Sequence, residues 1–128
     1  MTRITVRVRI YFGETLAIGP GRIELLEGVQ RTGSLSQAAR DMGMSYRRAW
    51  LLMQSLNESL SSPASFATRG GRRGGGATVT STGRALIQTY RRTEAKVARN
   101  ISERFARFAR HTRASTSSKL RVPAASRK

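Results

Sequence analysis

Apolar and polar residues alternate at the start of the chain. Residues Ile4, Val6, Val8, Ile10 and Phe12 are apolar, and the positions between them are Thr5, Arg7, Arg9 and Tyr11. Because successive side chains of a strand point to opposite faces, this pattern predicts a strand with one buried face over residues 4–12. Gly13 and Glu14 are typical of a hairpin turn, and Thr15 to Ile18 can form a short return strand. We therefore expect an N-terminal β-hairpin.

The pattern then changes to a helical period. Gly19-Pro20-Gly21 interrupts the strand, and Ile23, Leu26 and Val29 recur three residues apart. This spacing predicts a helix from about residue 22 to residue 31 with these side chains facing inward. Gly33 follows it, and glycine is the favoured helix terminator.

Two short helices joined by a tight turn are predicted next. Ser34 begins an S-x-x-Q capping box, so the first helix can start there and run to about Met42. Gly43 tolerates a turn with positive φ, and Ser45 can cap a second helix over residues 46–60. Such a pair is a common device for placing the second helix in the DNA major groove.

The second helix has two chemically different sides. Its apolar arc is formed by Ala49, Leu52, Met53, Leu56 and Leu60. Arg47 lies nearly opposite this arc with Leu51 and Gln54 beside it, Arg48 to one side and Trp50 at the boundary. Arginine can bind guanine through two hydrogen bonds, and glutamine can bind adenine in the same way. The outward side is therefore predicted to contact bases and phosphates; the alternative is that both arginines are ordinary solvated residues.

A segment rich in glycine and arginine, RGGRRGGG, follows between two short strands predicted over residues 64–68 and 77–80. Phe66 and Val79 are the apolar residues able to anchor these strands. This arrangement is typical of the wing of a winged helix, and its tip carries Arg69, Arg72 and Arg73. Arginine suits a narrow, strongly negative minor groove. A basic linker without structure, or an RGG-type RNA-binding segment, are the alternatives.

The last regular element is a long helix, predicted from about Gly83 to Phe108 and capped by residues 80–82. Its apolar stripe consists of Leu86, Tyr90, Val97, Ile101, Phe105 and Phe108. At 1.5 Å per residue such a helix is about 40 Å long, more than so small a domain can cover. We therefore expect the same helix of a second copy to cover the stripe. The alternative is a single helix that packs only on its own core.

Composition and charge define the class of partner. The 128 residues fit one domain, expected at 1–109, followed by a disordered basic tail at 110–128. Lys and Arg number 24 against 7 acidic residues, a net charge of +17 that favours salt-sensitive binding to nucleic acid. The chain has no cysteine, one histidine and no clustered carboxylates, so we expect neither an enzyme nor a metal site. Without an apolar run of about 18 residues, we expect no membrane partner and a cytoplasmic, nucleoid-associated protein.

Several motifs together resemble the N-terminal DNA-binding domain of the ModE-type molybdate-responsive transcription regulators, a winged helix shared with LysR-type regulators. They are G-P-G-R, G-S-L-S-x-A-A-R, M-S-Y-R-x-A-W and the glycine-rich segment, within about residues 6–108. The resemblance implies a homodimer joined by the long helix. It also assigns to the DNA-binding surface Ser34, Ser36, Ser45, Tyr46, Arg47 and Arg48, and to the wing Arg72 and Arg73.

Regulators of this family that sense molybdate use further C-terminal oxyanion-binding domains, for which residues 110–128 leave no room. We therefore expect no molybdate cofactor, and a separate partner protein as the sensor.

These observations predict a mainly α fold with a small β part: a winged helix-turn-helix with an N-terminal β-hairpin and a long C-terminal dimerisation helix. The predicted function is that of a sequence-specific regulator that binds double-stranded DNA as a homodimer. The alternative is a general nucleic-acid-binding protein, nucleoid-type or RNA-binding, in which the charge supplies most of the affinity.

Overall fold

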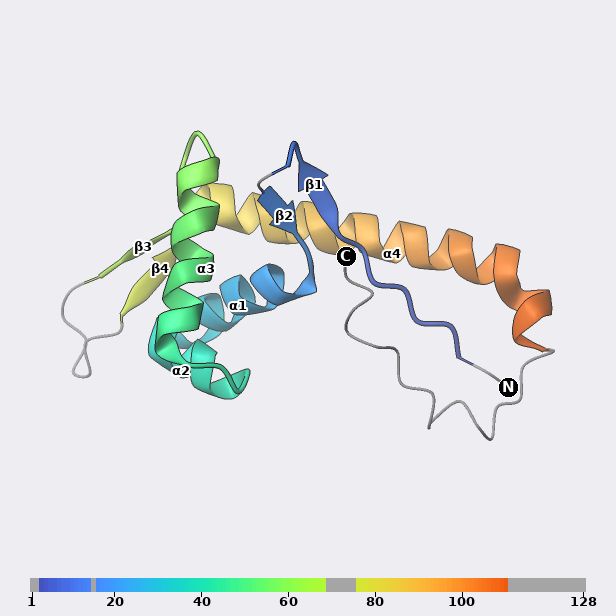
Figure 1. Ribbon diagram of the computed structural model, residues 1–128, viewed down its shortest axis with the longest axis horizontal. Coiled ribbons are helices and arrows are strands. Elements are labelled where there is room, and N and C mark those ends of the chain that lie inside the picture. Colours follow the sequence, from blue (N-terminus) through green and yellow to red (C-terminus); the bar gives the residue numbers. More distant parts are fainter. Residues whose placement is uncertain (1–2, 15, 69–75, 111–128) are drawn as a thin grey trace. The chain divides into compact units, whose positions relative to one another are not determined.

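The structure is a computed structural model that describes residues 3–14, 16–68 and 76–110 (Figure 1). Its elements in chain order are β1 Ile10–Phe12, β2 Leu16–Ile18, α1 Pro20–Thr32, α2 Leu35–Asp41, α3 Tyr46–Ser59, β3 Ser65–Ala67, β4 Ala77–Val79 and α4 Ser81–Ala109. The expected mainly helical architecture, with a long C-terminal helix, is confirmed. The three wing-tip arginines and the basic tail beyond residue 110 lie outside the described residues.

The chain divides into two compact units. One is Arg7–Glu94, and the other, within the described part, consists of residues 3–6 and 95–110. Every feature of the candidate interface described below belongs to the first unit.

The N-terminal hairpin is shorter than the alternation predicts. β1 and β2 pair antiparallel, with Ile10 opposite Ile18 and Phe12 opposite Leu16. β2 has only three residues, so residues 4–9 have no partner strand in the described part of the chain. The predicted alternation of burial still holds from Ile4 to Ile10, whereas Phe12 is 56% exposed and does not share the buried face.

Local signals in the sequence set the ends of the helices. α1 begins at Pro20, which suits a first helical position because its missing N–H needs no partner there. Gly33 ends it with φ of 72° and donates its N–H to the carbonyl of Val29 at 2.7 Å. The Ser34 hydroxyl accepts the N–H of Gln37 at 3.0 Å, which is one half of the expected capping box. The other half is absent, because the N–H of Ser34 donates to the hydroxyl of Thr32 at 3.1 Å and the side-chain oxygen of Gln37 accepts from Arg40 at 3.1 Å.

The core of the first unit forms where α1, α2, α3, the strands and the start of α4 meet. Its fully buried large side chains are Tyr90, Ile18, Ile23, Leu25, Leu26, Leu56 and Val29. Helices α1 and α2 approach closely at Gly28, where an added Cβ would lie 2.9 Å from the Cβ of Ala38. Small residues at this crossing therefore fix how α2, and the turn that follows it, sits on α1.

β3 and β4 form a second antiparallel pair, which Figure 1 shows beside α3. The expected anchoring role of Phe66 is wrong, because this side chain is 53% exposed. Ser65 is the register partner of Val79 and both are buried, whereas Phe66 lies opposite Thr78 and both of these are exposed. A further bridge joins Ser34 to Gly76, so the segment before α2 continues the sheet.

Candidate nucleic-acid interface

The first turn of α3 presents the strongest basic surface of the helix pair. The hydroxyl of Ser45 accepts the N–H of Arg48 at 3.1 Å, so α3 begins where the sequence predicted. Gly43 has φ of 71° and makes the turn between α2 and α3. Arg47 and Arg48 are exposed, and their guanidinium groups make no hydrogen bond or ion pair with the described residues. They are therefore available to an external anion.

Arg47 and Arg48 line a shallow groove between α3 and the start of α1. We call it the α1–α3 groove; it is lined by Arg22, Ser45, Arg47, Arg48, Leu51, Leu52 and Ser55. Three of these residues are cationic and none is acidic. A polyanion placed here would meet guanidinium and hydroxyl donors without an opposing carboxylate.

Arg22, the last residue of the G-P-G-R motif, lines this groove although nothing in the sequence assigns it to the DNA surface. From α1 it donates to the carbonyl oxygen of Leu52 at 3.4 Å and to the hydroxyl of Ser55 at 2.7 Å. Burial, and secondly the neighbouring Arg9, lower the pKa of Arg22. The position of Arg22 beside α3 depends on the crossing of α1 and α3, for which the local sequence carries no signal.

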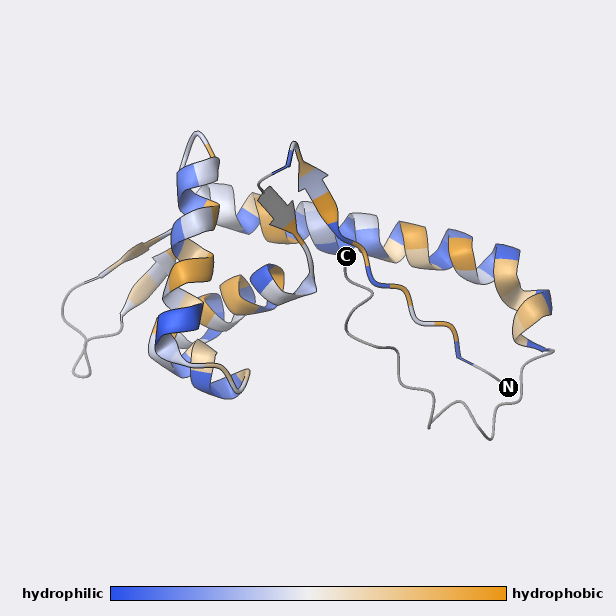
Figure 2. Cartoon of the chain, in the orientation of Figure 1, coloured by the Kyte–Doolittle hydropathy of each residue, from blue (hydrophilic) through white to orange (hydrophobic). Residues whose placement is uncertain are grey.

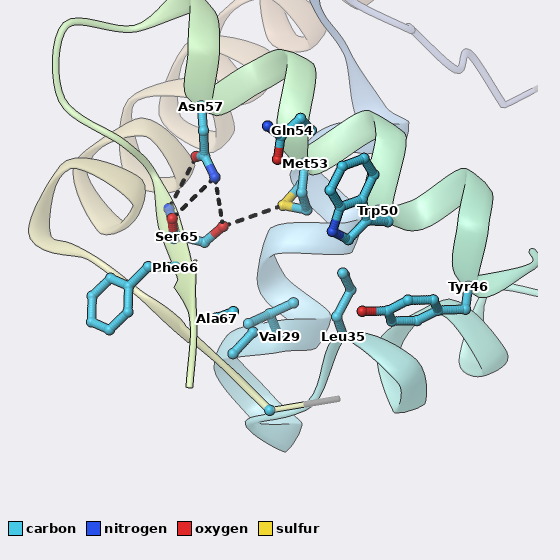
Figure 3. A pocket seen from close by; sticks show the side chains of 12 residues that line it. Val29, Leu35, Tyr46, Trp50, Met53, Gln54, Asn57, Ser65, Phe66 and Ala67 are labelled. Atoms are coloured by element: carbon cyan, nitrogen blue, oxygen red, sulfur yellow. Dashed lines mark hydrogen bonds between the residues drawn. The ribbon is translucent and has the colours of Figure 1, made fainter. Parts of the chain in front are cut away.

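The opposite flank of α3 faces the β3–β4 hairpin and is shown in Figure 3. We call this cavity the hairpin groove; α3 contributes Tyr46, Trp50, Met53, Gln54 and Asn57 to its lining, and β3 contributes Ser65, Phe66 and Ala67. Tyr46, Trp50 and Phe66 are each about half exposed, at 47%, 45% and 53%. The volume is about 100 Å³, well below the roughly 300 Å³ at which small-molecule sites begin. The groove is therefore a surface feature between helix and hairpin.

Asn57 fixes the hairpin to α3. Its side-chain oxygen accepts the N–H groups of Ala64 at 2.9 Å and Ser65 at 3.2 Å, and its amide donates to the Ser65 carbonyl at 3.0 Å. The Ser65 hydroxyl also contacts the sulfur of Met53, as the dashed lines in Figure 3 show. The start of β3 is therefore held at a set position relative to the helix.

The remaining residues expected at the DNA surface have other surroundings. Gln54 is half-buried and donates to the carboxylate of Glu58 at 2.9 Å, so its amide is partly engaged within α3. Ser34 is half-buried and caps α2, and Ser36 is half-buried in its first turn. Neither serine lines either groove. The structure thus brings together Ser45, Arg47 and Arg48, and separately Tyr46 and Gln54.

The apolar stripe of α4 has two different environments. Within the first unit, Leu86 packs partly against the core and Tyr90 is 2% exposed, with its hydroxyl donating to the carbonyl of Val8. In the other unit, Phe105 and Phe108 are 49% and 51% exposed, and their ring centroids lie 5.8 Å apart. Apolar bands recur along α4 to its end (Figure 2). The exposed members of the stripe are therefore its last two, Phe105 and Phe108.

Two findings concern other kinds of site. Among the described residues, no group of three histidine, cysteine, aspartate or glutamate side chains could hold a metal ion. No helix within the described ranges has both the length and the apolarity needed to cross a membrane.

Comparison with known proteins finds relatives over part of this chain. No family model matches the chain. Over most of its length, however, it is homologous to the N-terminal region of ModE transcription regulators and to Mop proteins, at 32–45% identity.

Three relatives illustrate this homology. The molybdenum-pterin-binding protein MopB of Rhodobacter capsulatus is 45% identical over 85 residues, 66% of this chain and 32% of MopB. The transcriptional regulator ModE of Haemophilus influenzae is 32% identical over 90 residues, which are 70% of this chain and 35% of that regulator. The DNA-binding transcriptional dual regulator ModE of Escherichia coli is 39% identical over 77 residues, which are 60% of this chain and 29% of that regulator. The match spans about a third of each relative, and the ModE relatives are transcription regulators, not enzymes.

Proposed function

We propose that this protein is a sequence-specific, double-stranded DNA-binding transcription regulator with a winged helix-turn-helix fold, in which α3 enters the major groove. The observation that carries this proposal is the exposed first turn of α3, where Arg47 and Arg48 have no side-chain partner among the described residues. Homology to ModE regulators supports the same assignment. Arg47 is the base-reading residue, and Arg48 and Arg22 contact phosphates along the α1–α3 groove.

The β3–β4 hairpin acts as the wing in this proposal. The hydrogen bonds of Asn57 tie the hairpin to α3, so a helix seated in the major groove would bring the hairpin to the adjacent groove or backbone. Arg69, Arg72 and Arg73 belong to the connection between the two strands and supply the wing's positive charge. Tyr46 and Gln54 face the space between helix and wing.

The regulator acts as a homodimer joined through α4. Val97 and Ile101 are half-buried, and Phe105 and Phe108 are exposed, in the part of α4 outside the first unit. An apolar stripe at helical spacing is the feature that pairs helices in a symmetric dimer. Two copies would present two copies of α3 to two half-sites.

Selection of bound duplexes from a random pool tests the function. A regulator of this kind enriches one sequence with two symmetry-related half-sites and prefers it by about 10³ to 10⁷ over random DNA at physiological salt. The competing possibility, a general nucleic-acid-binding protein, is favoured by the net charge of +17 and leaves the pool without enrichment.

The matched variants Arg47→Ala and Arg92→Ala then test the assigned reader. Both remove one exposed arginine from a helix, but Arg92 lies on α4 and lines neither groove. Arg47→Ala should lower discrimination at one base position by about 1–3 kcal/mol, whereas Arg92→Ala should leave the preferred sequence unchanged. An equal loss of affinity for all sequences in Arg47→Ala would contradict base reading by this residue.

A further inference from the structure

Leu51 is an exposed apolar side chain on the outward side of α3. It is 47% exposed and lies four residues from both Arg47 and Ser55, one helical turn from each on the same face. Single exposed apolar residues are common and need no explanation by themselves. Leu51 differs because it lines the α1–α3 groove among three arginines and two serines. Because Leu51 lies one helical turn from Arg47, the proposed base-reading residue, its partner should be sought on the DNA.

We propose that Leu51 reads a thymine by packing against its C5-methyl group in the major groove. This inference rests on the proposed function, since it requires α3 to enter that groove. Thymine is the base whose major-groove edge presents a methyl group, and the other bases present hydrogen-bond donors and acceptors there. A leucine side chain offers no hydrogen bond, so the methyl group is the feature of a base edge that it complements. Contact with that methyl also removes apolar surface from water on both sides.

The helix geometry places this thymine relative to the base read by Arg47. Four residues correspond to about 6 Å along a helix axis, and base pairs are stacked about 3.4 Å apart. A helix lying along the groove therefore brings Leu51 to a base pair one or two steps from the one contacted by Arg47. The preferred site should contain a thymine at that spacing in each half-site.

A protein partner is the competing explanation for an exposed leucine, and the surroundings of Leu51 count against it. Its apolar neighbour in the groove, Leu52, is half-buried and packs partly against the protein's own core. The rest of the groove is lined by arginine and serine side chains without a carboxylate. Charge complementarity therefore favours a polyanion at this surface.

The test removes one methyl group from the DNA at a time. The duplex selected from the random pool is remade with each thymine in turn replaced by deoxyuridine, which keeps its pairing with adenine. The wild-type protein should bind about fourfold more weakly when the one contacted thymine of either half-site is changed, which is the effect of one buried methyl group. Leu51→Ala should bind the thymine and uracil duplexes equally, and Leu51→Met, which keeps an apolar side chain of similar reach, should retain the preference.

Trp50→Ala is the matched control. Trp50 is 45% exposed, close to the value for Leu51, but it lines the hairpin groove instead of the α1–α3 groove. This variant should keep the full difference between thymine and uracil. Loss of the difference in Trp50→Ala with retention in Leu51→Ala would overturn the proposal.

Two further outcomes separate this inference from the proposed function. A wild-type protein that prefers its site but binds every uracil duplex as well as the thymine duplex reads no methyl group, so the inference fails and the function stands. A pool that yields no preferred duplex overturns both.

Discussion

Arg91 on α4 holds the carboxylate of Glu27 on α1 through two hydrogen bonds, 2.9 Å from Nε to Oε2 and 2.8 Å from Nη2 to Oε1. A third bond, of 2.8 Å, joins Nη1 to Glu94 one turn along α4. The hydrogen bonds to Glu27 and then Glu94 raise the pKa of Arg91, so the guanidinium stays charged at any working pH. Within the first unit, this cluster is a specific polar link between α1 and the start of α4.

Glu27→Gln should lower the free energy of unfolding by about 1 kcal/mol, because a bidentate charged pair at a partly exposed site is worth little more than that. The loss should shrink at high salt. Glu24→Gln is the control, since Glu24 is an exposed carboxylate on the same helix. Urea denaturation measures both variants. Equal effects in the two would mean that Arg91 contributes nothing specific.

Tyr90 predicts how stability responds to alkaline pH. Burial is the largest cause that raises the pKa of its phenol, and Glu94 adds to the rise, while Arg91, Arg7 and Arg9 act in the opposite direction. In the unfolded chain the phenol ionises near pH 10. The folded state keeps its proton to higher pH, so the contribution of Tyr90 is complete below pH 10 and is lost as the pH rises through the folded value.

Tyr90→Phe should therefore flatten the fall of the melting temperature above about pH 10. At neutral pH it should lower the free energy of unfolding by about 1 kcal/mol, because the carbonyl of Val8 loses its donor. Tyr11→Phe is the control at neutral pH: it removes a hydroxyl from a tyrosine that is 60% exposed and should leave the free energy of unfolding nearly unchanged. If the melting temperature of Tyr90→Phe falls above pH 10 as steeply as that of the wild type, ionisation of Tyr90 is not the cause of the fall.

Gly83 predicts a large effect from a single methyl group. It lies in the first turn of α4, and an added Cβ would clash with the carbonyl oxygen of Ala64 and lie 2.7 Å from a methyl carbon of Val79. Gly83→Ala should lower the free energy of unfolding by about 1–3 kcal/mol, as overpacking does. At Gly21, in the first turn of α1, an added Cβ meets nothing within 4 Å. Gly21→Ala should be neutral or stabilising in the same denaturation experiment.

The helices could be predicted from the sequence because their signals are local. The serine caps at Ser34 and Ser45 and the glycine at Gly33 act within one turn of the chain, and the observed helix ends lie within about two residues of those expected. The β-strands were less well predicted. Their length and inward face depend on which residue lies opposite, so Phe66 is exposed although it is the most apolar residue of β3.

The candidate site divides in the same way. Arg47 and Arg48 follow from the period of one helix, and the structure finds both exposed. The period of α3 could not indicate Arg22, because Arg22 lies on α1. It donates a hydrogen bond to Ser55, which is 33 residues away in the sequence. Tyr90 shows the opposite error. It belongs to the apolar stripe of α4 that was expected to face a second copy, but it packs in the core of its own unit. A helical period identifies an apolar face without saying what covers it.

The exposed end of α4 gives the prediction for self-association. Phe105 is 49% exposed and lies beside Phe108, whose ring also stacks with Arg107 at 4.6 Å. If this surface joins two copies, Phe105→Ser should weaken the dimer by roughly tenfold to a hundredfold, because each of the two copies loses burial of the exposed half of a side chain that contributes about 1.5–3 kcal/mol when wholly buried. Ala106→Ser is the control, because it introduces the same hydroxyl at an exposed neighbour without removing a large apolar side chain. Sedimentation velocity over a range of concentrations measures the association, and circular dichroism checks that the helix remains. A wild-type protein that sediments as a monomer at tens of micromolar would show that the stripe does not pair, and a DNA site with a single half-site would then be expected.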